Sequence, residues 1–280
     1  MATDFIATAR KAVNAPLGVL DGFGEQMSFY GRAVGWLPRT VRHYKKETLR
    51  LLSEVVFGSG ALAIIGGTVG VIGFLSFFTG TEVGLQGYAA LQQLGVASYS
   101  GFISAFFNTR EIAPLIAGIA LSATVGCGFT AQLGAMRISE EIDALEVMAV
   151  PSLPFLVTTR VIAGFIAVIP LYVIGLLSSY MASYVIVVYY YGDSAGTYSH
   201  YFHLFLPPLD VLWSFFKVLV FAIVIILTHC YYGYTASGGP AGVGVAVGRA
   251  VRLSIVAINV LDFFLSFAIW GSTTSVRLAG

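Results

Sequence analysis

Long apolar runs separated by short polar segments dominate the chain. Five runs stand out: 55–81, 112–136, 161–192, 211–232 and 253–271. Lys217 and Asp262 are the only charged residues inside them. Because an α-helix rises about 1.5 Å per residue, about 20 residues cross the roughly 30 Å hydrocarbon core of a bilayer. The pattern therefore predicts an all-α integral membrane protein with about five transmembrane helices.

The segment 96–108, VASYSGFISAFFN, is apolar but too short to cross a bilayer alone. It either extends the second predicted helix, which we expect to bend at Pro114, or forms a separate re-entrant element. The remaining residues of 82–109 and those of 193–210 are predicted to be loops on the outer side.

An amphipathic pattern precedes the first apolar run. Apolar residues recur at intervals of three or four: Phe29, Ala33, Leu37, Val41 and Tyr44. Basic residues occupy the positions between them, so 28–52 is predicted to be a helix at the inner membrane interface, broken near Pro38. A soluble N-terminal helix with one polar face is the alternative. We expect residues 1–52 to form a cytoplasmic N-terminus with this interfacial helix, and 53–280 to form the transmembrane domain.

Composition supports the membrane assignment. The chain is 57% hydrophobic and only 10% charged, with a mean hydropathy of +0.84, whereas about a quarter of the residues in soluble domains are charged. A net charge of +1 gives no support for nucleic-acid binding. Both cysteines fall inside apolar runs, so a disulfide framework or a zinc site is not supported. We expect no cleavable signal peptide, because the first fifty residues contain no apolar core of the required length.

The distribution of basic residues predicts the orientation. Most of the 15 Lys and Arg residues lie before the first predicted helix or in the connections on that same side. Because basic segments stay in the cytoplasm, we expect a multi-pass protein of the plasma membrane. Its N-terminus would be cytoplasmic and its C-terminus extracytoplasmic.

An acidic segment, ISEEIDALEVMAVP at 138–151, lies between the second and third runs. Its carboxylates are Glu140, Glu141, Asp143 and Glu146. Helical spacing places Ile138, Ile142, Leu145 and Ala149 on the opposite face. Ser139 is the expected N-cap and Pro151 the expected stop. From the residues alone, a solvated loop helix and a helix that docks on a partner both remain open. A metal or carboxylate catalytic site is not favoured, since no histidine lies between residues 43 and 200.

Four charged residues lie in or beside the predicted helices: Arg110, Glu111, Lys217 and Asp262. A charge in lipid must be paired or reach water. These side chains therefore either line a polar path or form structural ion pairs, for example Lys217 with Asp262.

Small residues recur at helical spacing in the first two helices. They are Gly66, Gly70 and Gly73 in the first helix, and Ser122, Gly126 and Thr130 in the second. Rows of small residues let helices approach closely, so helix packing is their expected role.

Two histidines, His200 and His203, lie near Asp210 in the segment HYFHLFLPPLD. A pair of histidines at this spacing is a weak indication of a metal or hydrolase site. Interfacial histidines and aromatic residues that contact an extracytoplasmic partner are the other interpretation.

Three stretches resemble the MlaE/YrbE permease family. They are YKKETLRL at 44–51, NTREIAPLIAGIALSATVGCGFTAQLGAMRISEEIDALEVMAVPSLPFLVTTRVIAG at 108–164, and THCYYGYTASGGPAGVGVAVGRAV at 228–251. Members of this family are membrane subunits of ABC-type lipid transporters associated with Mce proteins. The first and third stretches resemble the B-type YrbE subunit of actinobacterial, including mycobacterial, Mce systems.

The resemblance implies specific partners and roles. The segment 139–150 would be a coupling helix that docks in a groove of a cytoplasmic ABC ATPase dimer. The other partners would be an A-type YrbE permease, forming a heterodimer, and extracytoplasmic Mce proteins. The cargo would be a hydrophobic lipid such as a fatty acid, mycolate or sterol, moved in the direction of uptake.

The chain has no G-x-x-x-x-G-K-[ST] segment, so ATP and Mg²⁺ are expected on the partner ATPase and no cofactor on this chain. We therefore expect a transport subunit, not an enzyme. An ion-coupled secondary transporter using Asp262, Glu111 and Lys217 is one alternative, although no internal repeat is evident. An intramembrane enzyme using His200 and His203 is another.

Overall fold

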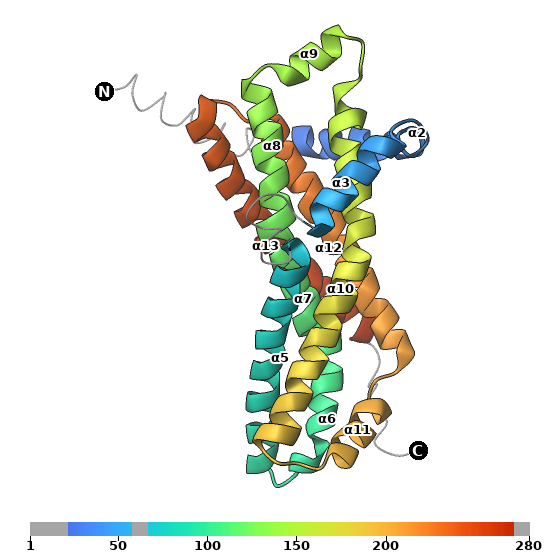
Figure 1. Ribbon diagram of the computed structural model, residues 1–280, viewed down its shortest axis with the longest axis vertical. Coiled ribbons are helices and arrows are strands. Elements are labelled where there is room, and N and C mark those ends of the chain that lie inside the picture. The colour runs from blue at the N-terminus through green and yellow to red at the C-terminus, as the bar shows by residue number, and fades with distance from the viewer. Residues whose placement is uncertain (1–21, 58–66, 272–280) are drawn as a thin grey trace, which may run out of the picture.

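The chain folds into a bundle of long helices (Figure 1). The structure is a computed structural model, and it describes residues 22–57 and 67–271. Within these ranges there is no strand, and five helices are long and apolar enough to cross a membrane. They span Gly67–Gln93, Ala97–Ile138, Leu153–Tyr190, Pro208–Tyr234 and Gly239–Trp270. The predicted all-α membrane fold with five spanning helices is thus confirmed.

The short helices lie at the two ends of the bundle (Figure 1). At one end are α2 (Leu37–His43), α3 (Lys45–Phe57) and α9 (Glu141–Val147). At the other end are the turn that follows α5 (Gly67–Gln93) and the helix α11 (Ala195–Leu204). The N-terminal segment and the acidic helix therefore share one end, as the predicted topology requires.

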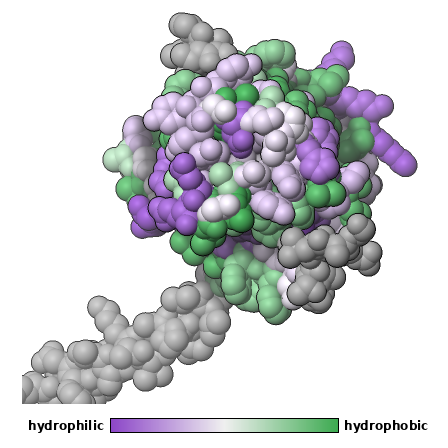
Figure 2. Space-filling model, turned by 90° about the horizontal axis from the view of Figure 1, so that it is seen from below, coloured by the Kyte–Doolittle hydropathy of each residue, from purple (hydrophilic) through white to green (hydrophobic). Residues whose placement is uncertain are grey.

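Polar residues mark the α11 end of the molecule. Figure 2 looks onto this end: hydrophilic and intermediate residues gather across the end face, and hydrophobic residues lie around it. This distribution suits a protein end that emerges from the hydrocarbon core into water.

The second spanning helix is continuous from Ala97 to Ile138 and includes the segment 96–108 almost entirely. Its parts are η1 (Ala97–Tyr99), α6 (Ser100–Ile103), η2 (Ser104–Ile112), α7 (Ala113–Leu121), η3 (Ser122–Gly126) and α8 (Cys127–Ile138). Of the two interpretations for 96–108, helix extension is correct. The wide π-helical turns of η2 end two residues before Pro114, which has no N–H for the ordinary helical hydrogen bond. At 42 residues, the helix is about 60 Å long and exceeds the hydrocarbon thickness.

The third spanning helix is continuous as well. It consists of η4 (Leu153–Thr158), α10 (Thr159–Val185) and η5 (Ile186–Tyr190). The fourth and fifth are α12 (Pro208–Tyr234) and α13 (Gly239–Trp270). The fifth begins well before the predicted start at 253. Pro240 lies in its first turn, where a missing N–H has no cost.

The predicted outer loops are mostly helical, so this prediction was wrong. Helix α5 continues through Glu82 to Gln93, and Gln86 donates a hydrogen bond to Glu82 one turn earlier, at 2.9 Å. Such i, i+4 pairs let polar residues extend a helix beyond its apolar stretch. In the second loop, the side chain of Ser194 accepts a hydrogen bond from the backbone of Thr197 and caps α11.

The N-terminal amphipathic segment is helical at 22–35 and again in α2 and α3. The interruption at Trp36 comes two residues before Pro38, close to the predicted break. The first half of its apolar face packs on the bundle: the Phe29 ring lies 5.4 Å from that of Tyr231. Val41, in the second half, is half exposed. The Tyr44 ring, at the end of the second half, lies 5.4 Å from that of Phe155, so the segment contacts the bundle in both halves and exposes only part of its apolar face.

Close contact between α5 and α10 depends on glycines. A Cβ at Gly80 would overlap the backbone carbonyl of Ser179, and the Gly80 carbonyl accepts a hydrogen bond from Ser183 Oγ at 2.7 Å. Gly73 also faces α10, but a Cβ there would lie 3.6 Å from Ile174, an ordinary contact. Of the predicted row, Gly70 lies in α5 and Gly66 lies outside the described residues.

We predict that Gly80→Ala destabilises the protein and that Gly73→Ala does not. Overpacking against backbone costs roughly 1–3 kcal/mol, and each kcal/mol lowers Tm by about 2–4 °C in a protein of this size. Thermal melting of both variants in the same detergent measures the difference. Equal melting temperatures would contradict the proposed α5–α10 contact.

Candidate functional sites

A cluster of five charged side chains joins three spanning helices. Arg110 and Glu111 come from η2, Asp210 and Lys217 from α12, and Asp262 from α13. The guanidinium of Arg110 donates to Asp210 Oδ2 from Nη2 at 2.6 Å and from Nε at 2.9 Å. The ammonium of Lys217 lies 2.7 Å from Asp262 Oδ1. The ion pair between Lys217 and Asp262 that the sequence suggested is therefore present.

Lys217 is the centre of the cluster. Its side chain is 0% exposed, yet its Nζ donates to the Arg110 carbonyl at 2.6 Å and to Ser266 Oγ at 2.7 Å. The Arg110 carbonyl lies one turn before Pro114, which cannot donate to it. The ammonium thus satisfies a backbone group that the proline leaves without its usual partner.

Glu111 is the part of the cluster that reaches outward. Its side chain is 35% exposed, lies 3.5 Å from Lys217 Nζ, and accepts a hydrogen bond from Ser266 Oγ at 2.8 Å. Together with Asp210 and Asp262 it gives three carboxylates against two cations. The cluster therefore holds the helices together and presents one partly accessible acid.

Aromatic rings cover the Arg110–Asp210 pair. The guanidinium lies 4.1 Å from the ring centroid of Phe106 and 5.2 Å from that of Trp270. The indole Nε1 of Trp270 donates to Asp210 Oδ1 at 3.0 Å. Because rings exclude water and attract cations, they strengthen the pair in this low-dielectric site.

The sequence reasoning missed three members of this site: Asp210, Ser266 and Trp270. Their spacing along the helices could have indicated them. Asp210 and Lys217 are seven residues apart on α12, and Asp262, Ser266 and Trp270 recur every four residues on α13. Residues at these spacings share one helix face.

The structure does not bring Asp210 together with the two histidines. Both carboxylate oxygens of Asp210 are occupied by Arg110 and Trp270. In α11, His203 Nδ1 lies 2.7 Å from the Ser199 carbonyl. Within residues 22–57 and 67–271, no group of three or more His, Cys, Asp or Glu side chains could hold a metal ion.

The second row of small residues, Ser122, Gly126 and Thr130, surrounds the buried imidazole of His229. Ser122 Oγ lies 3.1 Å from Nε2 of His229, and Thr130 Oγ1 lies 2.8 Å from its Nδ1. Ser254 also contacts Nε2, at 3.3 Å. Gly126 lies between them, and a Cβ there would approach the ring to 2.6 Å. The row thus joins the second helix to α12 through hydrogen bonds as well as close packing.

The acidic helix is shorter than the predicted segment 139–150 and starts differently. Ser139 is not its N-cap: its hydroxyl donates to the Ala135 carbonyl at 3.0 Å, in the last turn of α8. The chain reverses at Glu140, whose φ of 61° is left-handed, and α9 runs from Glu141 to Val147. Ala149, also left-handed at 60°, follows its end, so the helix stops before Pro151. The turn geometry overrode the capping preference of serine.

Local contacts involve three of the four carboxylates. Asp143 accepts a hydrogen bond from Arg137 at 2.7 Å, Glu146 accepts one from Ser152 at 2.6 Å, and Glu141 accepts one from Ser139 at 3.0 Å. All three acidic side chains remain on the exposed side of α9.

One apolar residue anchors α9, and two others project from it. Ile142 is buried against the bundle, as predicted. Val147 and Met148, in contrast, are 88% and 64% exposed at the tip of the molecule. Neither was singled out from the sequence. Exposed apolar side chains next to a carboxylate face are suited to contact another protein.

Comparison with known proteins identifies the family. The family described as "Permease MlaE" matches residues 57–268. The chain belongs to the MlaE permease family. The match covers four spanning helices completely and the fifth up to residue 268, together with the acidic segment and the five charged residues of the cluster.

Two of three relatives of this MlaE-family chain are named as probable ABC transporter permeases. A probable ABC transporter permease protein of Rickettsia bellii is 31% identical over 70% of this chain and 76% of its own length. A protein of Synechocystis sp. with the same description is 30% identical over 84% of this chain and 86% of its own. The chloroplastic protein TRIGALACTOSYLDIACYLGLYCEROL 1 of Arabidopsis thaliana is 32% identical over 75% of this chain and 60% of its own.

We predict that Lys217→Met strongly destabilises the permease, because it leaves Asp262 buried without a counter-charge. Removing one partner of a buried pair costs about 3–5 kcal/mol. The double variant Lys217→Met, Asp262→Asn should recover most of this loss, since no uncompensated charge remains. Thermal melting and the yield of monodisperse protein measure both effects. A double variant less stable than the single variant would show that the pairing does not account for the cost.

Proposed function

We propose that this chain is the permease subunit of an ATP-driven lipid transporter. Membership of the MlaE family and the names of its relatives support an ABC transporter permease. One relative is named after a diacylglycerol galactolipid, which supports a lipid cargo. Fatty acids, mycolates and sterols are the cargo classes that we propose, in the direction of uptake.

The observation that carries the proposal is the position of the acidic helix α9. Helix α9 stands at the end of the molecule between the two longest helices of the described chain, α8 preceding it and η4 with α10 following it (Figure 1). A partner that moves α9 would therefore move both. We propose that a cytoplasmic ATPase, carrying ATP and Mg²⁺, binds α9 through Val147 and Met148 and the carboxylates beside them.

Further parts of the proposal concern assembly and orientation. A second permease chain, a heterodimeric A-type partner, would complete the membrane portion, and extracytoplasmic Mce proteins would receive or deliver the lipid. The α9 end would face the cytoplasm of a plasma membrane, with the α11 end outside. Basic residues near α2 and α3 support this orientation.

The charge cluster favours a structural role over ion coupling. Lys217 has oxygen partners from Arg110, Asp262 and Ser266, so its ammonium is well satisfied. A proton relay step on Lys217 would require its ammonium to lose both its proton and several of these contacts.

We predict that Val147→Asp reduces co-purification of the ATPase and ATP-driven lipid transfer together. A buried charge in an apolar contact is unfavourable. The matched control is Leu94→Asp, because Leu94 is also highly exposed but lies in the turn after α5, at the opposite end. The measurements are pull-down of the ATPase and release of labelled lipid from proteoliposomes that contain the complete complex. Absence of ATP-dependent lipid movement in the unmodified complex would refute lipid transport. Equal ATPase binding by the two variants would refute docking at α9.

We predict that a cysteine at Ser139 is protected from a membrane-impermeant maleimide in intact cells, and that a cysteine at Leu94 is labelled. The native protein is the control, because Cys127 and Cys230 lie inside spanning helices. The opposite labelling pattern would invert the proposed orientation.

A further inference from the structure

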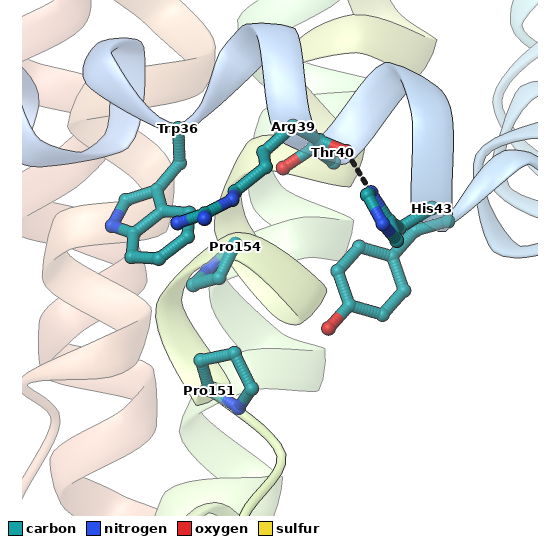
Figure 3. A pocket seen from close by; sticks show the side chains of 7 residues that line it. Trp36, Arg39, Thr40, His43, Pro151 and Pro154 are labelled. Carbon is teal, nitrogen blue, oxygen red and sulfur yellow. Dashed lines mark hydrogen bonds between the residues drawn. The ribbon is translucent and has the colours of Figure 1, made fainter.

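A pocket of about 480 Å³ lies at the α9 end of the molecule, between α2 and the start of the third spanning helix (Figure 3). The residues that line it are Trp36, Arg39, Thr40, His43, Tyr44, Pro151 and Pro154. Residues from α2 thus meet the segment that leaves α9, more than a hundred positions later in the sequence. Neither the charge cluster nor the acidic helix contributes to this pocket.

The pocket is cationic. None of its lining residues is acidic, whereas Arg39 and His43 are basic. The Arg39 guanidinium lies 5.5 Å from the centroid of the Trp36 ring, and no described carboxylate lies within 4.0 Å of it. The first acidic residue along the chain after α2 is Glu47. The neighbouring Arg50 donates a hydrogen bond to it at 3.0 Å and lowers the pKa of Glu47.

The pocket also has unused hydrogen-bonding capacity. The His43 ring uses Nδ1 toward the Arg39 carbonyl, at 3.0 Å, which leaves Nε2 for another group. The hydroxyl of Thr40 is buried and has no hydrogen-bond partner within the described ranges. Because a buried hydroxyl without a partner is costly, a ligand oxygen that reached it would be stabilised.

The walls are aromatic and apolar, formed by Trp36, Tyr44 and the two prolines. Trp and Tyr are enriched at the level of lipid headgroups. Val41 in α2 and Leu49 in α3 are exposed apolar residues, as expected where a helix meets a bilayer. A cationic pocket with such walls matches a phosphate linked to an apolar body better than a free polar anion.

We propose that this pocket binds the headgroup of an anionic phospholipid from the leaflet at the α9 end. The phosphate would contact Arg39 and His43, and the glycerol region would lie against Trp36 and Tyr44. The bound lipid would tie α2 to the segment at Pro151 and Pro154, so the anionic lipid content of that leaflet would influence the position of α9. The proposal does not depend on which lipid the protein transports.

The test is native mass spectrometry of the purified permease in detergent, titrated with phosphatidylglycerol. Parallel titrations use phosphatidylcholine, and phosphatidylglycerol with millimolar inorganic phosphate. Arg39→Gln should weaken the tightest phosphatidylglycerol binding step about tenfold, because it removes a charge-assisted contact. Arg42→Gln is the matched control: it makes the same change on the same helix, but Arg42 does not line the pocket. It should change binding less than about twofold.

Four outcomes would overturn the proposal. Equal losses in the two variants would indicate diffuse attraction to a basic surface. Equal affinity for phosphatidylcholine would remove the role of headgroup charge. Displacement of the lipid by inorganic phosphate would identify a free-phosphate site. Unchanged lipid binding in Arg39→Gln, with reduced co-purification of the ATPase, would assign the pocket to that protein.

Discussion

A charged group inside the hydrocarbon region has no water to solvate it, and the protein must provide its partners. Lys217 shows how far this requirement determines the structure. Its ammonium is completely buried, and its partners come from the second and fifth spanning helices. One side chain on α12 therefore sets the relative positions of three helices. A shift of α13 along α12 would separate Lys217 from Asp262.

The same constraint explains where the second helix departs from regular geometry. Pro114 removes one backbone donor, and the preceding residues form the wide turns of η2. Those turns carry Arg110 and Glu111, and the Arg110 carbonyl is bonded by Lys217. The irregular backbone is thus stabilised by the charges that it positions. Irregular turns of this kind are frequent at functional positions in helices.

Close packing links this region to the opposite end of the molecule. Gly80 allows backbone contact between α5 and α10, and Gly126 allows His229 to lie against the second helix. The second and third spanning helices are continuous over 42 and 38 residues, and α9 connects them. A displacement of α9 would therefore be transmitted through stiff elements and not absorbed in loops. The pocket beside α2 lies at the start of the third spanning helix, where a bound headgroup would add one contact to the helix that follows α9.

The sequence by itself determined that this is a membrane protein, that it is all-helical, how many helices span the bilayer, and which family it belongs to. The physical reason is that the length and polarity of a run decide whether it crosses a bilayer, and neither depends on neighbours. It also indicated the pair of Lys217 with Asp262, because few other counter-charges exist within the spans. Helix ends were predicted less well: local pairs such as Gln86 with Glu82 extended helices beyond their apolar runs. Only the tertiary structure decided that Asp210 belongs with Arg110, that Ser139 ends one helix instead of starting the next, and that Arg39 faces Pro154 across a pocket. The first and third outcomes depend on which helices are neighbours, and the second depends on the left-handed turn at Glu140. A pattern of residue types along one chain contains neither kind of information.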